Sequence, residues 1–328
     1  MADSPEHTPS PARLPYHKPV MLKECIEQLE MKPSGRYVDC TFGGGGHSEL
    51  MVQLLDAQGQ LYAFDQDPDA RRNADSWDYP NFHFIASNFR NLQAFLLAHQ
   101  ALPVDGILAD LGISSFQIDE PSKGFSIRFD GPLDMRMNPD QGLDAAHVIN
   151  TYSLDQLTRI FKVYGEVDNP RRLAERVILE RSRRAISTTM QLREALWPLA
   201  PRSREFKFLA QVFQAIRIEV NDELKALEEM LEQTAKVLAP GGRLVVLTYH
   251  SLEDRLVKNF MAKGDFEGIG QKDLMGNEIR PFEPVWRKAM VPNAQELEGN
   301  PRARSAKLRV ATKIDTVAKA PLFPKKSR

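Results

Sequence analysis

The sequence predicts an α/β protein with a Rossmann-like parallel sheet and an inserted helical segment. Short apolar runs alternate with helical patterns between residues 36 and 110, which indicates right-handed crossovers between parallel strands. The first run leads into four consecutive glycines, Gly43 to Gly46. Glycines at a strand-to-helix turn let the backbone approach a ligand closely. Two later runs each end in an acid, Asp65 and Asp110.

The composition describes an ordinary globular chain. It has 328 residues, of which 42% are hydrophobic and 27% charged, with a formal net charge of −1. This length indicates one large domain or two unequal ones. The two cysteines, Cys25 and Cys40, give no disulfide framework, no zinc spacing and no metal cluster, as expected in a reducing compartment. Residues 1–15 lack an apolar core, so we expect no signal peptide, and no apolar run reaches the roughly 18 residues that span a membrane. We expect a cytoplasmic protein without membrane partners.

The first third of the chain alternates regularly. Residues 1–15 are rich in Pro and Ser and predict a disordered tail, and a short helix is expected at 22–31. The alternation that follows predicts strands at 36–41, 60–65, 82–86 and 105–110, and helices at 48–56, 68–75 and 90–98.

After Asp110 this alternation stops. Residues 116–143 are dense in Gly, Pro, Asp and Met and predict a long structured loop. Three helical patterns follow, and they begin at Ser153, Asn169-Pro170 and Ser187 or Thr188. We therefore predict an inserted, mostly helical substrate-recognition domain at 116–205.

The alternation resumes after the insert. We predict a long helix at about 207–238, a turn at 239–242, a strand at 243–249 and a helix at 252–262. Two antiparallel strands near 283–291 and 306–314 then close the sheet, and a basic tail occupies 315–328. The main domain is thus expected to combine residues 16–115 and 206–314.

The glycine loop and the acid after the second strand fit either NAD or S-adenosylmethionine, since both carry ribose hydroxyls that Asp65 could bind. Three observations favour S-adenosylmethionine. The glycines are contiguous and precede His47, so they do not form G-x-G-x-x-G. Asp110 follows the fourth strand, where adenosylmethionine enzymes commonly contact a target amine. The Pro-Gly-Gly turn at 240–242 is frequent in methyltransferases. A nicotinamide-dependent oxidoreductase is the main alternative.

Eight stretches, in order along residues 16 to 312, carry a family resemblance. They are 16–22, 39–48, 109–117, 123–126, 131–137, 213–218, 249–255 and 300–305. The chain resembles the bacterial small-subunit ribosomal RNA methyltransferase H family. This resemblance implies a class I methyltransferase fold and transfer from S-adenosylmethionine to the exocyclic N4 of one cytidine in 16S rRNA, at the decoding centre of the small ribosomal subunit.

The resemblance also implies which residues contact the cofactor. They are Gly45, Gly46, His47, Asp65, Phe89, Asp110 and Gln117. Gly45 and Gly46 would let the amino-acid end of the cofactor approach the backbone, and Phe89 could lie against the adenine ring. One departure is visible: many members carry His-Pro-Ala-Thr-Arg where this chain has Lys207 to Gln211, which affects expected RNA contacts.

Methyl transfer to an amine needs alignment, and the cytosine amine is a poor nucleophile because its lone pair is delocalised. An acceptor for its N–H would localise that pair, and Asp110 is our first candidate, with a pure cofactor ligand as the alternative role. Ser114 and Ser115 could add polar contacts. His250 and Ser251 are expected to border the base pocket, unless Ser251 is only a helix N-cap.

The net charge conceals local clusters. Residues 159–207 carry twelve Lys and Arg against six Asp and Glu, and 301–328 carry nine basic residues against Asp315 alone. Such clusters suit RNA phosphates, so Arg181, Arg183 and Arg184 are candidate RNA contacts, although a solvated helix face would also explain them.

Two further classes are rivals. One is a ribosome-assembly factor that keeps this fold without the chemistry, although the intact glycines and acids argue against it. The other is a DNA N4-cytosine methyltransferase. Those enzymes typically carry Pro-Pro-Tyr or Pro-Pro-Trp after the fourth strand, where this chain has Leu-Gly-Ile-Ser-Ser, so we expect no DNA partner.

Overall fold

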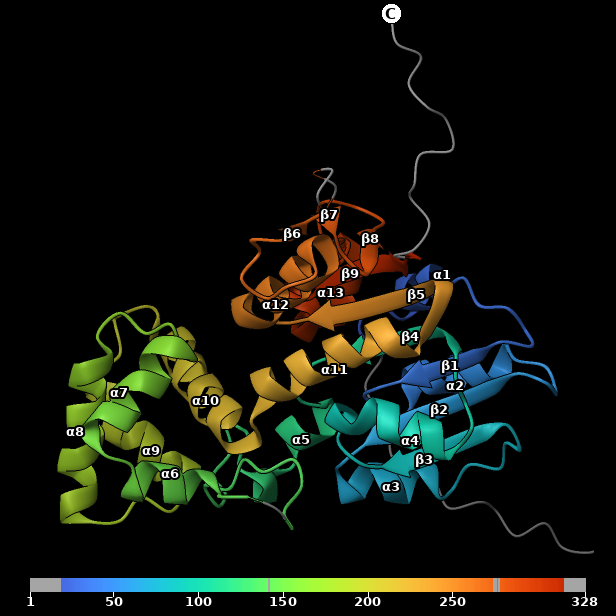
Figure 1. Ribbon diagram of the computed structural model, residues 1–328. Helices are drawn as coiled ribbons and strands as arrows, with labels where there is room; N and C mark the ends of the chain where they lie inside the picture. Colours follow the sequence, from blue (N-terminus) through green and yellow to red (C-terminus); the bar gives the residue numbers. More distant parts are fainter. Residues whose placement is uncertain (1–18, 141, 274–275, 277, 316–328) are drawn as a thin grey trace, which may run out of the picture.

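The computed structural model describes residues 19–140, 142–273, 276 and 278–315 (Figure 1). The disordered tail expected at 1–15 and nearly all of the expected basic tail, from residue 316 onward, lie outside the described residues.

A seven-stranded sheet forms the centre of the main domain, with the strand order β3-β2-β1-β4-β5-β9-β8. The first five strands are parallel, and β9 runs antiparallel between β5 and β8. Their bounds are β1 Arg36–Asp39, β2 Gln60–Asp65, β3 Phe82–Ala86, β4 Val104–Asp110, β5 Leu238–Thr248, β8 Phe282–Pro284 and β9 Lys307–Lys313. The strand order reverses direction between β1 and β4, and ligands of doubly wound sheets bind at such a point. The predicted Rossmann-like fold is confirmed.

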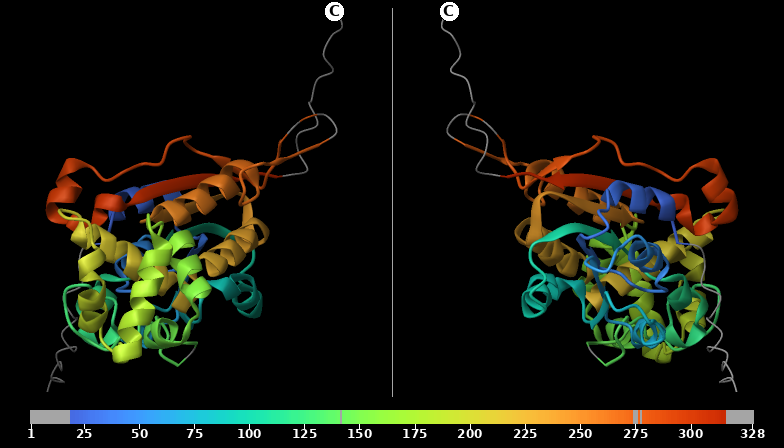
Figure 2. Two further views of the ribbon diagram at one scale, coloured as in Figure 1. Left: turned by 90° about the vertical axis from the view of Figure 1, so that its left-hand side faces the viewer. Right: turned by 90° about the vertical axis from the view of Figure 1, so that its right-hand side faces the viewer.

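The central strands of this sheet are buried on both sides, because helices cover both faces of the sheet. On one face, α4, α11 and α12 pack into the largest apolar core (Figure 1). On the other face, α1 packs against β4 and β5 and α2 packs against β2, and this core extends to Leu308 and Val310 of β9; the side views show α1 in blue beside the red β9 (Figure 2). The helices of this domain are α1 Leu22–Leu29, α2 Gly46–Gln53, α3 Pro68–Ala74, α4 Leu92–Ala98, α11 Glu223–Val237, α12 Ser251–Lys263 and α13 Ala294–Gly299.

The insert has an apolar core of its own and lies to one side of the sheet domain (Figure 1). Its helices are α5 Ser115–Asp119, α6 Ala145–Thr151, α7 Leu154–Val163, α8 Pro170–Arg183, α9 Thr189–Leu196 and α10 Glu205–Asn221. Ser153, Asn169 and Thr188 stand at the N-caps of α7, α8 and α9, as predicted. Short 3₁₀ turns complete the chain at η1 Phe89–Asn91, η2 Pro121–Lys123, η3 Trp197–Leu199 and η4 Pro301–Ser305.

The predicted helix at 207–238 is wrong in one respect: it is two helices that meet at Asp222. This residue has a left-handed backbone, with φ 51°, which ends α10 and redirects the chain into α11. The apolar face of α10, including Phe208 and Ile216, packs in the core of the insert, whereas Leu227 and Leu231 of α11 pack in the sheet core. The helical unit therefore extends past residue 205, to the end of α10.

Other elements differ more locally from the prediction. Helix α6 falls just after the stretch that we predicted as a loop. The strand expected at 283–291 is only three residues long, because Pro284 ends β8 and Met290 makes a single bridge to Leu308. A small hairpin of β6 Gln271–Lys272 and β7 Glu278–Ile279 was not predicted. Among the described residues, no helix is both long and apolar enough to cross a membrane.

Candidate active site

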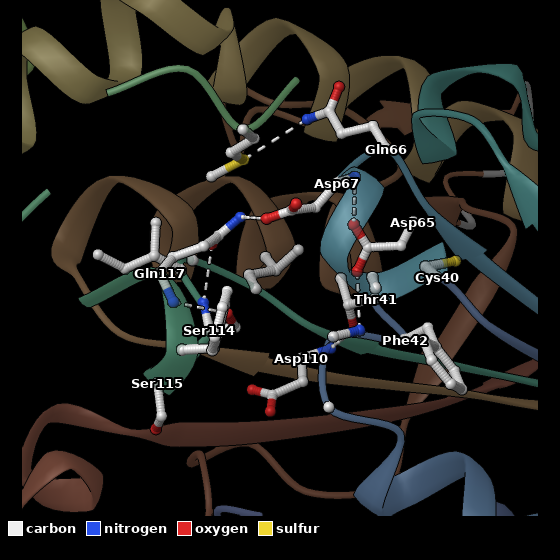
Figure 3. Close-up of a pocket in the computed structure, with 18 of the residues that line it drawn as sticks. Cys40, Thr41, Phe42, Asp65, Gln66, Asp67, Asp110, Ser114, Ser115 and Gln117 are labelled. Carbon is white, nitrogen blue, oxygen red and sulfur yellow. Dashed lines mark hydrogen bonds between the residues drawn. The ribbon is translucent and has the colours of Figure 1, made fainter. Parts of the chain in front are cut away.

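A cavity of about 390 Å³ opens at the carboxyl ends of the central strands (Figure 3). The glycine loop after β1, the ends of β2 and β4, and the start of α5 line it. Pro19 and Val20 reach it from the N-terminal segment, and Tyr249, Arg217 and Arg302 reach it from later in the chain. Segments that are far apart in sequence therefore enclose one site, as the fold requires.

Buried Asp39 fixes the glycine loop. Its carboxylate accepts hydrogen bonds from the Ser48 hydroxyl at 2.6 Å and from the Thr41 amide at 3.0 Å. The Thr41 hydroxyl in turn accepts the Asp110 amide at 2.7 Å, which joins the ends of β1 and β4. The loop is thus held in place on both sides before any ligand binds.

The glycines of this loop have different roles. Gly43 has φ 49°, and its amide donates to the Asp65 carboxylate at 2.7 Å. A Cβ on Gly46 would stand 2.1 Å from Pro19 Cγ, so only glycine fits beside that wall of the cavity. Gly45, which we expected to contact the cofactor, does not line the cavity. A Cβ there would lie 2.6 Å from Trp77 Cζ2, so the absence of a side chain serves packing.

Asp65 lies where the sequence predicted it, at the end of β2 in the cavity wall (Figure 3). It accepts backbone N–H groups from Gly43 and, at 2.9 Å, from Asp67. Burial raises the pKa of this carboxyl to about 6, although both hydrogen bonds oppose the rise. Phe89 of η1 also lines the cavity. A carboxylate and an aromatic ring in one cavity suit a ribose joined to a planar base.

Gln117 is buried, and all of its side-chain polar atoms are bonded within the protein. Its carbonyl accepts the Ser114 amide at 3.0 Å, and its amide group donates to Asp67 at 2.7 Å (Figure 3). Lys123 binds the same Asp67 at 2.6 Å and also Asp69. Gln117 lines the cavity but chiefly joins α5 to the end of β2. The sequence alone does not reveal the partners Asp67 and Lys123.

Ser114 and Ser115 both line the cavity, but their side chains have different roles at the start of α5. The Ser114 hydroxyl caps α5 by accepting the Gln117 amide at 3.1 Å. Ser115 is the first residue of that helix, and its side chain points away from Gln117 (Figure 3). Ser115 is therefore the better candidate for a substrate contact.

Asp110 ends β4 in the cavity wall, and two side chains approach its carboxylate. The Tyr249 hydroxyl donates to Oδ1 at 2.6 Å, and Nδ1 of His47 lies 3.8 Å from Oδ2. Burial raises the pKa of Asp110, while His47 and Tyr249 act to lower it. Burial also holds the pKa of Tyr249 well above its usual value, so its hydroxyl stays protonated. Tyr249 is a site residue that the sequence reasoning missed.

His250 and Ser251, which we expect to border the base pocket, do not line this cavity. His250, rather than Ser251, is the N-cap of α12, and its Nδ1 accepts the Glu253 amide at 3.4 Å. The Ser251 hydroxyl bonds Glu166. The neighbouring Tyr249 does line the cavity.

Glu223, His250 and Glu253 bring three possible metal-ligand atoms within 4.8 Å of one another. Because Nδ1 of His250 accepts a backbone hydrogen, the neutral ring carries its own hydrogen on Nε2. That Nε2 lies 3.0 Å from Glu253 Oε1, and Arg217 pairs with Glu223 at 2.8 Å. Although burial opposes it, His250 and Arg217 hold the pKa of Glu253 below its usual value. These contacts favour an ion-pair cluster over a metal site.

The three arginines proposed for RNA contact differ in exposure. Arg181 is half-buried, and its guanidinium donates to the Ile149 carbonyl at 2.7 Å, so it helps to hold α6 against α8. Arg183 and Arg184 are exposed at the end of α8, and Arg183 pairs with Glu180 of its own helix.

The chain is similar to proteins of one known family. The family model described as the MraW methylase family matches residues 15–314. A protein of Amoebophilus asiaticus named ribosomal RNA small subunit methyltransferase H is 52% identical over 295 residues, covering 90% of this chain and 95% of that protein. A Cytophaga hutchinsonii protein of the same name is 53% identical over 296 residues, covering 90% of this chain and 99% of that protein. Among solved structures, an rRNA methylase from Streptococcus thermophilus shows 13% identity and a TM-score of 0.39, covering 90% of this chain and 94% of that one.

Proposed function

The chain belongs to the MraW methylase family, and we propose that it transfers a methyl group from S-adenosylmethionine to the exocyclic N4 of a cytidine in 16S rRNA. One observation supports the chemistry above all others. A carboxylate, Asp110, lies in the cavity wall at the strand end beside the glycine loop, and the Tyr249 hydroxyl holds it at 2.6 Å. This arrangement suits transfer to an amine whose proton must be accepted.

The residues at the other end of the cavity fit the cofactor. Asp65 would accept the ribose hydroxyls, Phe89 would lie against the adenine, and the backbone of Gly43 and Gly46 would face the amino-acid end. S-adenosylmethionine supplies an electrophilic methyl group on a sulfonium. Asp65 already accepts two amide hydrogens, so its carboxylate is fixed in position before the cofactor arrives.

Asp110 would act on the target amine. Its carboxylate can accept one N4 hydrogen bond, which concentrates the nitrogen lone pair and offsets the positive charge that grows during transfer. The target cytidine must leave its base stack to reach Asp110 in the cavity wall. Ser115, at the start of α5, is placed to contact the extruded nucleotide.

The insert carries exposed cations and aromatic rings that suit RNA binding. Trp197 is 39% exposed and Phe206 54%, and their rings meet edge to face at 6.1 Å. The Arg193 guanidinium lies over both rings, at 5.1 Å and 5.8 Å from their centroids. The exposed residues Arg202, Arg204 and Lys207 lie on the loop between the rings and at the start of α10. We call Arg193, Trp197 and Phe206 the aromatic platform. Stacking surfaces flanked by cations suit unpaired RNA bases.

A direct assay tests the proposal. The protein is incubated with radiolabelled S-adenosylmethionine and small ribosomal subunits that lack the modification, and with the naked 16S rRNA in parallel. The RNA is then digested and its nucleosides are separated. We expect label in N4-methylcytidine, and loss of that label in Asp110→Ala with the cofactor still bound. Label in another nucleoside, or none with an intact cofactor site, would contradict the proposed reaction.

A further inference from the structure

We propose that His47 receives the proton that Asp110 takes from the target amine, and that Tyr249 positions Asp110 for this transfer. The inference rests on the proposed function. In the reaction, the bond between N4 and the methyl carbon forms while the sulfur–carbon bond breaks. The amine then carries one proton in excess. That proton passes to Oδ2 of Asp110 and on to Nδ1 of His47, which becomes an imidazolium.

The hydrogen bond on the far side of the ring determines which nitrogen of His47 can accept a proton. Nε2 lies 3.2 Å from the Val20 carbonyl oxygen, which can only accept. The neutral ring must therefore carry its hydrogen on Nε2, which leaves a lone pair on Nδ1. Nδ1 is the atom that faces Asp110 Oδ2, at 3.8 Å. A small closure of this gap would make a hydrogen bond.

Tyr249 determines which oxygen of Asp110 is available. Its hydroxyl occupies Oδ1 at 2.6 Å, so Oδ2 is left to face His47 and the cavity. The Tyr249 ring packs against the core that also holds Val20 and Leu247, which fixes the direction of the hydroxyl. Tyr249 is a positioning residue, since it acts through Asp110.

The pair of Asp110 and His47 lies among other ionisable groups. The His47 ring is only 5% exposed and lines the cavity. Near Asp110 are the acids Asp39 of β1 and Glu253 of α12 and the Cys25 thiol of α1. Burial raises the pKa of Cys25 well above its usual value, so the thiol stays neutral. Arg217 and Arg302 line the same cavity, so both acids and cations surround the pair.

His47→Gln separates the relay from a purely structural role. The glutamine amide can reach the Val20 carbonyl as Nε2 does, but nothing replaces Nδ1. We expect the single-turnover methylation rate to fall by about 10²–10⁴-fold, the contribution of a positioned acid–base group. The rate is measured at saturating S-adenosylmethionine and the Kd is measured in parallel, so that a lost cofactor contact of His47 is separated from the lost relay. The acidic limb of the pH–rate profile should move to higher pH, because His47 no longer stabilises the Asp110 carboxylate.

Two further variants complete the test. Tyr249→Phe keeps the ring and removes the hydroxyl, and it should also lower the rate and move the acidic limb upward. Gln53→Ala changes an exposed residue of the same helix as His47 and should behave as wild type. An active wild-type enzyme with unchanged rates and profiles in His47→Gln would overturn the relay alone. An inactive wild-type enzyme would instead overturn the proposed function.

Discussion

At the scale of single residues, the buried carboxylate of Asp65 predicts how cofactor binding depends on pH. Burial raises its folded pKa to about 6, so it is ionised above that pH and protonated below it. The protonated form is a poorer acceptor for two ribose hydroxyls. We therefore expect the Kd for S-adenosylmethionine to increase as the pH falls from 7.5 to 5, measured by calorimetry.

Asp65→Asn is the control for this dependence. It should bind the cofactor weakly at every pH and lack the change near pH 6. A wild-type Kd that stays constant between pH 7.5 and 5 would show that Asp65 does not bind the ribose through its charged form.

A second prediction at this scale concerns Gly45. Alanine there would have to adopt φ 80° and would place its Cβ 2.6 Å from Trp77. Gly241 has nearly the same φ, 82°, but nothing within 4 Å of its Cβ position. Both alanine variants incur a left-handed backbone cost of about 1–2 kcal/mol, and Gly45→Ala adds an overpacking cost of about 1–3 kcal/mol. Urea denaturation should therefore show the larger loss of unfolding free energy for Gly45→Ala. Equal losses of unfolding free energy in the two variants would show that packing against Trp77 does not require a glycine at position 45.

The site residues show what a sequence can predict at this scale. Asp65 and Asp110 could be named because strand ends after a glycine loop have recognisable local patterns, whereas Phe89 was named from the family resemblance. Tyr249 could not be named, because its contact with Asp110 joins residues that are 139 positions apart. Gln117 was named from family resemblance, but its bond to Asp67 became evident only in three dimensions.

At the scale of elements, the strands β2 and β3 were predicted to the residue, since turn residues flank short apolar runs. The break between α10 and α11 was missed because the amphipathic pattern continues through it, without Gly or Pro. Asp222 makes the break with one left-handed residue, and its carboxylate pairs with Arg90 at 2.9 Å. Only the two separate cores reveal that the helices belong to different units.

This break predicts the effect of substitutions at Asp222. Asparagine tolerates the left-handed region, so Asp222→Asn should lose only an exposed ion pair worth up to about 1 kcal/mol. Valine is β-branched and disfavours this region, so Asp222→Val should add a strain cost of about 1–3 kcal/mol. Thermal and urea unfolding compare the two variants. Equal stabilities would mean that the junction adapts without strain.

At the scale of the whole molecule, the proposed functions divide between two apolar cores. The sheet core carries the cavity, and the insert core presents the exposed residues proposed to contact RNA. The sequence predicted this division but placed its boundary at residue 205. Charge patterns alone also grouped Arg181 with Arg183 and Arg184, although only the latter two are exposed. Burial depends on tertiary packing, which local composition does not determine.

The aromatic platform makes a prediction that spans both parts of the molecule. Trp197→Ala removes one stacking surface, worth about 1–3 kcal/mol per base, so the Kd for small ribosomal subunits should rise roughly fivefold to a hundredfold. Trp286, equally exposed at 39% but in the sheet domain, is the matched control, and Trp286→Ala should bind as wild type. Both variants should bind S-adenosylmethionine normally.

The salt dependence of binding then separates stacking from charge. Loss of stacking leaves the number of neutralised phosphates unchanged, so Trp197→Ala should weaken binding by a similar factor at every salt concentration. Arg183→Glu with Arg184→Glu should instead make binding less sensitive to salt, because phosphate contacts are lost. If Trp197→Ala bound subunits as tightly as Trp286→Ala, the insert would contact RNA through its cations alone. The exposed rings would then need another partner.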